Sequence, residues 1–442
     1  MKIQLSDHFT FKKLIRFTLP SIGMLVFESI YCVVDGFFVS NFVGKTPFAA
    51  VNFIIPVLMV FGAFGAMFGT GGSALVAKTL GEGNPRQAKQ LFSLFVYSAI
   101  TVGIILSLLA FFLIRPVAET LGAEKEMLSD CVIYGRIVLL ALPALLLQYE
   151  FQSFFATAEK PQLGLIVTVA AGVANLILDA LLVVVFPLGI VGAAVSTAIS
   201  QYVGGVIPLI YFARRNDSLL KLPRTGFSGK ALLKGCSNGS SEFLSTISLS
   251  VVSMLYNVQL MKYAGENGVA AFGTLMYAST IFTSVFLGYS MGVSPVIGFH
   301  YGAQNQSELK GLLKKSLAII GGFSAVMFLS SELLGSPLST IYVGYDKSLL
   351  HLTQRGFALF SFSFLFAGFP VFGSAFFTAL NNGLVSASIS FLRTGVFQIL
   401  SVLILPIFLG LDGIWFSIVT AEIAATIVAI LFCIRNRQKY GY

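Results

Sequence analysis

Long apolar stretches alternate with short polar breaks along the whole chain. Each apolar stretch has at least the roughly 20 residues that an α-helix needs to cross a bilayer. The breaks are rich in Gly, Asn, Pro and charged residues, as in GEGNPRQAK and GAQNQSELK. The pattern predicts twelve membrane-spanning helices, at about 14–42, 48–78, 88–114, 128–156, 162–186, 190–212, 236–262, 268–299, 311–334, 350–379, 384–409 and 412–434.

The two halves of the chain match at a constant offset of 221 residues. Gly44 pairs with Gly265 and Gly81 with Gly302, and the register continues as far as Ser196 with Ser417. Such a match indicates that one unit was duplicated and fused. Because each half holds six helices, an even number, both halves enter the membrane from the same side and form parallel repeats.

These patterns predict an all-α integral membrane protein. Its twelve helices form two pseudo-symmetric, parallel six-helix lobes around a central cleft. The lobes are expected at 1–213 and 236–442. The segment 214–235 is the one connection long and polar enough to act as a cytoplasmic linker between lobes that move independently.

Composition supports a membrane protein. The chain has 442 residues, of which 56% are hydrophobic and 11% charged, and its mean hydropathy is +0.88. A soluble domain has roughly 25% charged residues. The net charge of +9 fits membrane topology better than nucleic-acid binding, because 20 of the 28 Lys and Arg residues fall on the side of the N-terminus. This bias predicts that both termini are cytoplasmic.

Several kinds of chemistry are not expected. The four cysteines have no CxxC spacing and the three histidines lie far apart, so neither a disulfide framework nor a zinc site is predicted. The chain has no Walker A sequence, which excludes ATP as the energy source. We expect no removable signal peptide, no cofactor, no enzymatic activity and no obligatory protein partner.

Carboxylates within the spans are the main candidates for function, because a charge inside a bilayer is costly. The first half has four of them, and none is kept at the matching position of the second half. Glu28, Asp35, Glu150 and Asp179 correspond to Leu249, Tyr256, Val371 and Leu400. We infer that the first lobe carries charge-based chemistry that the second lobe lacks.

The spacing of these residues suggests an ion site. Asp35 and Asp179 lie at similar distances from the outer ends of their helices, so they can share one depth. Glu28 lies seven residues before Asp35, and Asn175 lies four before Asp179, each pair on one helix face. A carboxylate in a dry pocket can take up a proton, and Asn and hydroxyl oxygens beside it could instead hold Na⁺.

Other polar residues within the spans have simpler expected roles. Arg393 is expected to be structural and to reach toward the inner face. Glu242 lies close to the cytoplasmic surface, and Glu422 lies in the last span. Pro20 follows the first turns of the first helix, where it frees a carbonyl and permits a bend, so it is a candidate hinge.

Four segments together resemble the multidrug and toxic compound extrusion (MATE) family. They are LPSIGMLVFESIYCVVDGFFVSNFVG, GGSALVAKTLGEGN with its repeat GVSPVIGFHYGAQN, ATAEKP, and NLILDALLVVVFPLGIVGAAVSTAIS. They look most similar to the DNA-damage-inducible-type and staphylococcal-type branch. In that branch the positions of Asp35, Asn175 and Asp179 form the cation site, the hydroxyl at Thr197 completes it, and a proline matched by Pro20 bends the helix. A different branch places acids in the second lobe, where this chain reads SMLYNVQL and FSFSFLFAGFP.

The resemblance implies a drug/cation antiporter in a prokaryotic cytoplasmic membrane. Lipophilic organic cations would leave by alternating access in exchange for inward H⁺ or Na⁺. Cationic drugs or dyes would be held by aromatic faces and carboxylates. Expected substrate contacts are Tyr31, Gln148, Glu150, Tyr256, Asn257 and Met291, with Glu28 assisting the ion site.

Three alternatives stay open. A flippase for lipid-linked saccharides or another amphipathic lipid shares the two-lobe plan, but it needs a strongly cationic cavity. An intramembrane aspartyl protease requires GxGD, whereas the acids here lie in VVDG and LILDA. A gated channel is not excluded by the sequence.

Overall fold

The computed structural model describes residues 3–123, 125–344 and 346–442, and this part of the chain is helical, with short turns and one longer irregular linker. The first half contains α1 (Phe11–Phe38), η1 (Val39–Val43), α2 (Lys45–Gly81), α3 (Pro85–Thr120), α4 (Lys125–Leu140), α5 (Leu142–Thr157), α6 (Pro161–Asp179), η2 (Ala180–Val185) and α7 (Gly189–Ala213). The second half contains α8 (Gly229–Gly302), α9 (Gln306–Val343), α10 (Lys347–Phe360), η3 (Ser361–Ser363), α11 (Phe364–Ala379), α12 (Gly383–Phe391), η4 (Leu392–Phe397), α13 (Gln398–Leu409) and α14 (Leu411–Tyr440).

The helices account for the twelve predicted spans. Ten helices of the described chain are long and apolar enough to cross a membrane, and α4 and α5, bent by 59° at their junction, supply another span as a pair. The 74-residue α8 counts as one of the ten, but its backbone is non-helical at Gly265. Dividing α8 at this break gives twelve spans, and the break lies in the predicted AGENG turn.

Matching glycines end the first span of each half. Gly44 has φ 122° between η1 and α2, and Gly265 has φ 60° inside α8. A side chain would strain both conformations, which explains why glycine occupies the two positions. They are 221 residues apart, so the two halves share the same turn chemistry.

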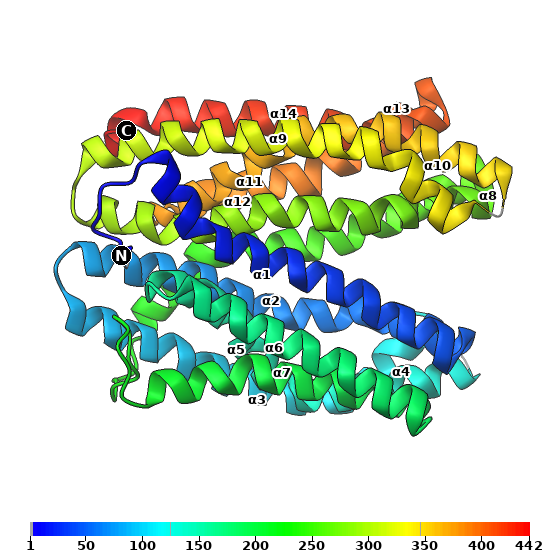
Figure 1. Ribbon diagram of the computed structural model, residues 1–442, viewed down its shortest axis with the longest axis horizontal. Coiled ribbons are helices and arrows are strands. Elements are labelled where there is room, and N and C mark those ends of the chain that lie inside the picture. The colour runs from blue at the N-terminus through cyan, green and yellow to red at the C-terminus, as the bar shows by residue number, and fades with distance from the viewer. Residues whose placement is uncertain (1–2, 124, 345) are drawn as a thin grey trace.

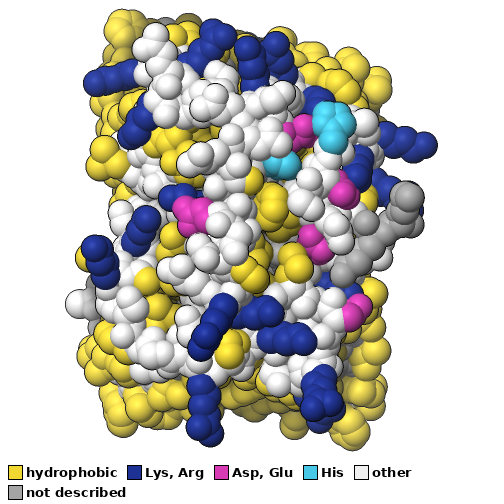
Figure 2. All heavy atoms as spheres, turned by 90° about the vertical axis from the view of Figure 1, so that its left-hand side faces the viewer, with side chains coloured by type: hydrophobic (Ala, Val, Ile, Leu, Met, Phe, Trp, Pro, Cys, Tyr) yellow, Lys and Arg dark blue, Asp and Glu magenta, His cyan; other side chains and the backbone are white. Residues whose placement is uncertain are grey.

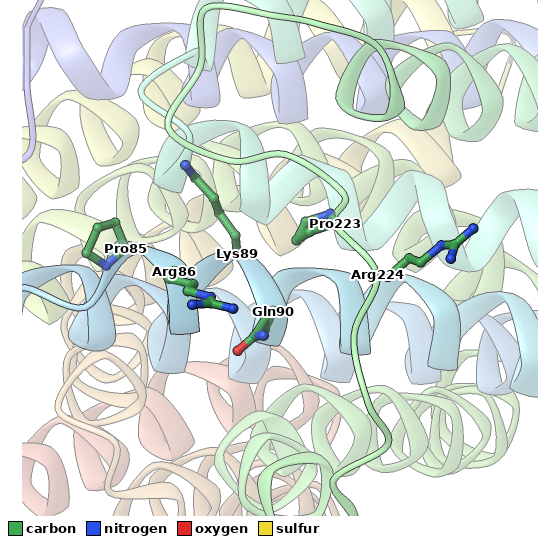
Figure 3. Close-up of a pocket in the computed structure, with 6 residues that line it drawn as sticks. All are labelled: Pro85, Arg86, Lys89, Gln90, Pro223 and Arg224. Carbon is green, nitrogen blue, oxygen red and sulfur yellow. The ribbon is translucent and has the colours of Figure 1, made fainter.

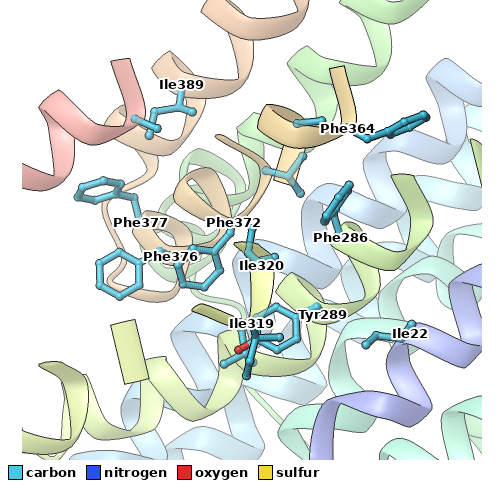
Figure 4. Packing of buried hydrophobic residues seen from close by; sticks show 14 of the residues in the cluster. Ile22, Phe286, Tyr289, Ile319, Ile320, Phe364, Phe372, Phe376, Phe377 and Ile389 are labelled. Carbon is cyan, nitrogen blue, oxygen red and sulfur yellow. The ribbon is translucent and has the colours of Figure 1, made fainter. Parts of the chain in front are cut away.

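Two helical bundles lie side by side, with α1 and α2 near their boundary (Figure 1). Each bundle has its own hydrophobic core, one formed mainly by residues 39–222 and the other mainly by residues 252–442. The first part of α1 is an exception, because Leu14, Phe17 and Ile22 join the second core. Figure 4 shows Ile22 near Tyr289, with Phe372, Phe376 and Phe377 of the same cluster on the other side of Tyr289. Further along α1, the ring of Phe27 packs against Gly172 of α6 in the first bundle.

Both termini and the 214–228 segment lie at one end of the molecule, called here the linker end (Figure 1). Backbones of the two bundles touch closely at this end. A Cβ added to Gly81 would lie 2.0 Å from the Phe299 carbonyl oxygen, and one added to Gly302 would lie 2.0 Å from the Lys78 carbonyl oxygen. Phe299 and Gly302 are the repeat equivalents of Lys78 and Gly81, so the two contacts are reciprocal.

The N-terminal segment crosses the linker end and binds to both bundles. The Leu5 amide donates to Glu159 Oε1 at 2.8 Å in the first bundle. The Phe9 amide donates to Glu308 Oε1 at 2.9 Å in the second. Leu5 and Phe9 are fully buried, so residues 5–9 help to close this end of the molecule.

Candidate functional site

The candidate ion site lies between α1, α6 and α7 of the first bundle. Asp35 comes from α1, Asn175 and Asp179 from the last turns of α6, and Ser196 from α7. Directly after Asp179 the chain changes to the π-helix η2. Such π-helical segments are rare and frequently lie at functional sites.

The structure brings three predicted residues together in one polar network. Asp35 interacts with both Asp179 and Asn175 across the α1–α6 interface. Ser196 Oγ donates a hydrogen bond to Asp179 Oδ1, and the Asn175 side-chain amide lies 3.5 Å from Ser196 Oγ. Asp179 and Ser196 are completely buried.

Oxygen atoms of this network are left without partners. Within the described chain, Asp35 Oδ1, Asn175 Oδ1 and Asp179 Oδ2 are buried and accept no hydrogen bond. Buried acceptors are normally satisfied, so three unsatisfied oxygens in one place need an explanation. A proton shared by the carboxyl groups, or a cation coordinated by oxygen atoms, would satisfy them.

Ser196, rather than Thr197, supplies the hydroxyl that contacts the carboxylate. Thr197 Oγ1 donates to the Ala193 carbonyl at 3.0 Å and also interacts with Tyr134, which lies close to both aspartates. The sequence analysis missed Ser196 and Tyr134. The match of Ser196 with Ser417 in the repeat was a signal that Ser196 faces the interior.

A hydroxyl exchange distinguishes these two neighbours. Ser196→Ala removes a hydrogen bond to a charged group, which costs about 1.5–3 kcal/mol. We expect it to shift the ion concentration for half-maximal transport by about tenfold or more. Thr197→Ala, which removes a bond to the backbone of its own helix, serves as the matched control and should shift that concentration less. Equal shifts in the two variants would contradict the central place of Ser196.

A second polar cluster lies between α1 and α5. Gln152 Nε2 donates to Glu28 Oε2 at 2.9 Å. One turn further along α1, Tyr31 interacts with Gln148. Glu28 and Tyr31 are both half-buried. The cluster therefore presents a carboxylate and an aromatic ring side by side, which suits an organic cation.

The remaining predicted substrate residues lie in different surroundings. Glu150 is completely buried, and neither of its carboxyl oxygens has a hydrogen-bond partner in the described chain. Asn257 is exposed and Met291 is half-buried. In this conformation Glu150 is therefore closed off from a ligand in solution, while Asn257 and Met291 are not.

Tyr256 occupies in the second bundle the position of Asp35 in the first. Its hydroxyl lies 2.6 Å from Ser417 Oγ, and Ser417 is the repeat equivalent of Ser196. Its ring stacks on Phe272 at 4.9 Å, and only 1% of its surface is exposed. A neutral, hydrogen-bonded pair of hydroxyl groups thus occupies the place of the carboxylate and serine in the first bundle. Tyr256 is a core residue in this conformation.

Arg393 forms a structural ion pair inside the second bundle, with a partner that was not expected from the sequence. Its Nε lies 2.9 and 2.8 Å from the two carboxyl oxygens of Glu422, which is 2% exposed. Glu242 on α8 also interacts electrostatically with Arg393. Arg393 lies in the π-helix η4, and its partner is 29 residues further along on another helix.

Comparisons with known proteins agree with this architecture. The MatE family model matches residues 20–181 and again residues 243–404. The multidrug export protein MepA of Staphylococcus saprophyticus is 26% identical over 440 residues, covering 97% of this chain and 94% of that protein. MepA of Staphylococcus aureus MRSA252 is 25% identical over 436 residues, with the same coverage of each chain.

Solved structures share the fold over nearly the whole length. A crystal structure of MATE in complex with MaL6 has a TM-score of 0.93 at 21% identity and covers 98% of each chain. An outward-facing multidrug resistance MATE family transporter of the MOP superfamily has a TM-score of 0.90 at 22% identity. It covers 98% of this chain and 97% of its own.

Proposed function

This chain belongs to the MatE family of membrane transporters, and from that premise we propose that it exports lipophilic organic cations in exchange for an inward-moving H⁺ or Na⁺. The relatives named multidrug export proteins support this proposal. The observation that carries it is the network of Asp35, Asn175, Asp179 and Ser196, with its three buried oxygens that lack hydrogen-bond partners in the described chain.

The network suits coupling because its net charge depends on what it binds. Two carboxylates close together in a low-dielectric site repel each other strongly. A proton or Na⁺ between them removes that repulsion and satisfies the free oxygens. Binding of the ion therefore changes the packing of α1 against α6, and α1 also contacts the second bundle.

Helix α1 is the element that we propose to transmit this change. Its beginning packs in the second core through Leu14, Phe17 and Ile22, whereas its end carries Asp35 in the first bundle. Pro20 lies within the first region, between Phe17 and Ile22, and a bend there would move the Asp35 end of the helix relative to its beginning. We propose that this bend expels a substrate held near Glu28 and Tyr31.

The linker end is proposed to be cytoplasmic. Figure 2 shows this face studded with Lys and Arg side chains and with fewer acidic ones. Basic residues gather on the cytoplasmic side of membrane proteins. The tight contacts of Gly81 and Gly302 close this end, which we propose is the cytoplasmic one.

The proposed antiport is tested in vesicles that contain the purified protein and ethidium. A pH gradient and a Na⁺ gradient are imposed separately on the wild type, on Asp35→Asn and on Asp346→Asn. We expect one gradient to drive efflux, which Asp35→Asn lowers by about 100-fold or more because it removes a coupling charge. Asp346→Asn, at the N-cap of α10 just before its apolar span, is the matched control and should retain transport.

Both outcomes of this experiment are informative. The gradient that drives efflux identifies the coupling ion. If neither gradient moved ethidium, this result would contradict export of organic cations and favour an anionic, lipid-linked substrate. The structure gives that alternative little support, since the buried Arg393 is neutralised by Glu422.

A further inference from the structure

A groove lined by basic residues lies at the linker end, between the start of α3 and the irregular segment 214–224. Two adjoining cavities of about 350 and 320 Å³ share Lys89 and Pro223. Figure 3 shows Arg86 and Lys89 on α3 beside the irregular segment that carries Pro223 and Arg224. The basic residues that line the cavities are Arg86, Lys89, Arg214, Arg215, Lys221 and Arg224.

The linker is held in a fixed conformation over α3. Leu220 is fully buried in the core of the first bundle together with Phe212. The Leu222 amide donates to the Phe212 carbonyl at 3.2 Å, and Ser218 Oγ donates to the Leu220 carbonyl at 2.7 Å. The groove is therefore preorganised, because one wall is the helix α3 and the other, the linker, is fixed by a buried side chain and by hydrogen bonds.

The positive charges in the groove are not neutralised by the protein. None of the six basic residues forms an ion pair within the described chain. The neighbouring acid Asp217 binds Lys160 at 2.8 Å, and this hydrogen bond lowers the pKa of the Asp217 carboxyl. Glu82, just before α3, is paired with Lys78. The start of α3 adds a partial positive charge, and its N-cap residue Asn84 makes no side-chain hydrogen bond to it.

The level of the groove in the membrane indicates the source of its ligand. It lies at the start of α3 and just after α7, two helices long and apolar enough to cross a membrane, so we infer that it lies at the level of lipid headgroups. The same linker also carries exposed apolar side chains, with Leu219 37% and Phe227 81% exposed. Exposed apolar residues beside a basic site are typical of a surface that contacts the membrane.

We propose that this groove binds the phosphate headgroup of an anionic phospholipid from the leaflet at the linker end. Arg and Lys side chains surround a phosphate and donate charge-assisted hydrogen bonds to its oxygens. Because residues of both α3 and the linker contact the same headgroup, the bound lipid fastens the linker to the first bundle. General enrichment of Lys and Arg on this face would explain their number, but not that six of them line two adjoining cavities beside a fixed segment of the linker.

The test measures lipid binding to the full-length protein by native mass spectrometry and by thermal stability. Micelles are supplemented with phosphatidylglycerol, cardiolipin or phosphatidylcholine. The double variant Arg86→Gln/Arg224→Gln is compared with Lys230→Gln/Lys234→Gln, which removes two exposed charges beyond the groove. We expect anionic lipids to bind and stabilise the wild type and the control, and binding to weaken about tenfold or more in the groove variant.

Two results would overturn the proposal. Equal loss of anionic-lipid binding in both double variants would show unspecific attraction to a basic face. Equal stabilisation by inorganic pyrophosphate would show that the groove takes a soluble phosphate and not a lipid headgroup. Retained ethidium transport in the groove variant would verify that the variant is folded in either case.

Discussion

Gly81→Ala is expected to lower drug efflux about tenfold or more and to shift the transporter toward a conformation open at the linker end. The added Cβ would lie 2.0 Å from the Phe299 carbonyl oxygen and 2.9 Å from the Ala303 nitrogen. Backbone atoms of a packed helix cannot give way as a flexible side chain does. Overpacking of this kind costs about 1–3 kcal/mol. Here it destabilises only the conformation in which the two bundles are in contact at the linker end.

The shift is measured as a distance between spin labels at Gln87 on α3 and Ser307 on α9, with the four native cysteines replaced. Both positions are exposed at the linker end, on different bundles. Opening of the linker end lengthens the distance between the two labels. We expect the fraction of molecules with this longer distance to increase in Gly81→Ala and in its repeat equivalent Gly302→Ala. Gly322→Ala is the control, because a Cβ there meets nothing within 4 Å. Unchanged distances together with unchanged efflux would show that these glycines do not limit closure.

Arg393→Met is expected to give the largest loss of stability among substitutions outside the candidate ion site. It would leave the Glu422 carboxylate buried without its partner, which costs about 3–5 kcal/mol. Replacing both residues, as in Arg393→Met/Glu422→Met, removes the unpaired charge as well and should restore much of the lost free energy of unfolding.

The free energy of unfolding can be followed by SDS titration in mixed micelles. Arg355→Met is the matched control, because Arg355 also pairs with a carboxylate, Asp412, but at an exposed position. An exposed pair contributes about 0–1 kcal/mol, so this variant should lose little. If Arg393→Met were no more destabilising than Arg355→Met, the buried pair would not stabilise the second bundle.

The sequence was sufficient for features that depend on local pattern. Span lengths follow from bilayer thickness, and the turns at Gly44 and Gly265 follow from the positions where glycine recurs. Asn175 and Asp179 share a helix face because they are four residues apart, whatever the rest of the fold does. These inferences needed no knowledge of how the helices pack.

Features that depend on helix rotation could not be predicted. Adjacent residues of a helix point about 100° apart, so the choice between Ser196 and Thr197 required the phase of α7 against α6. The pairing of Arg393 with Glu422 likewise depends on the rotation of two helices, because the residues are too far apart in sequence to be neighbours on one. The packing of Leu220 into the first core could not be predicted either, because the composition of the linker resembles that of a flexible segment.

The reciprocal contacts of Gly81 and Gly302 have a consequence for the origin of the fold. In a two-fold symmetric homodimer, residue i of one copy contacts residue j of the other, and j contacts i. Gly81 meets Phe299 and Gly302 meets Lys78 in this way, although all four residues belong to one chain. A single six-helix repeat therefore carries both sides of this interface and could have dimerised through it before fusion. Once the copies were fused, only one of them needed to keep its carboxylates, and the other could replace them with the neutral Tyr256–Ser417 pair.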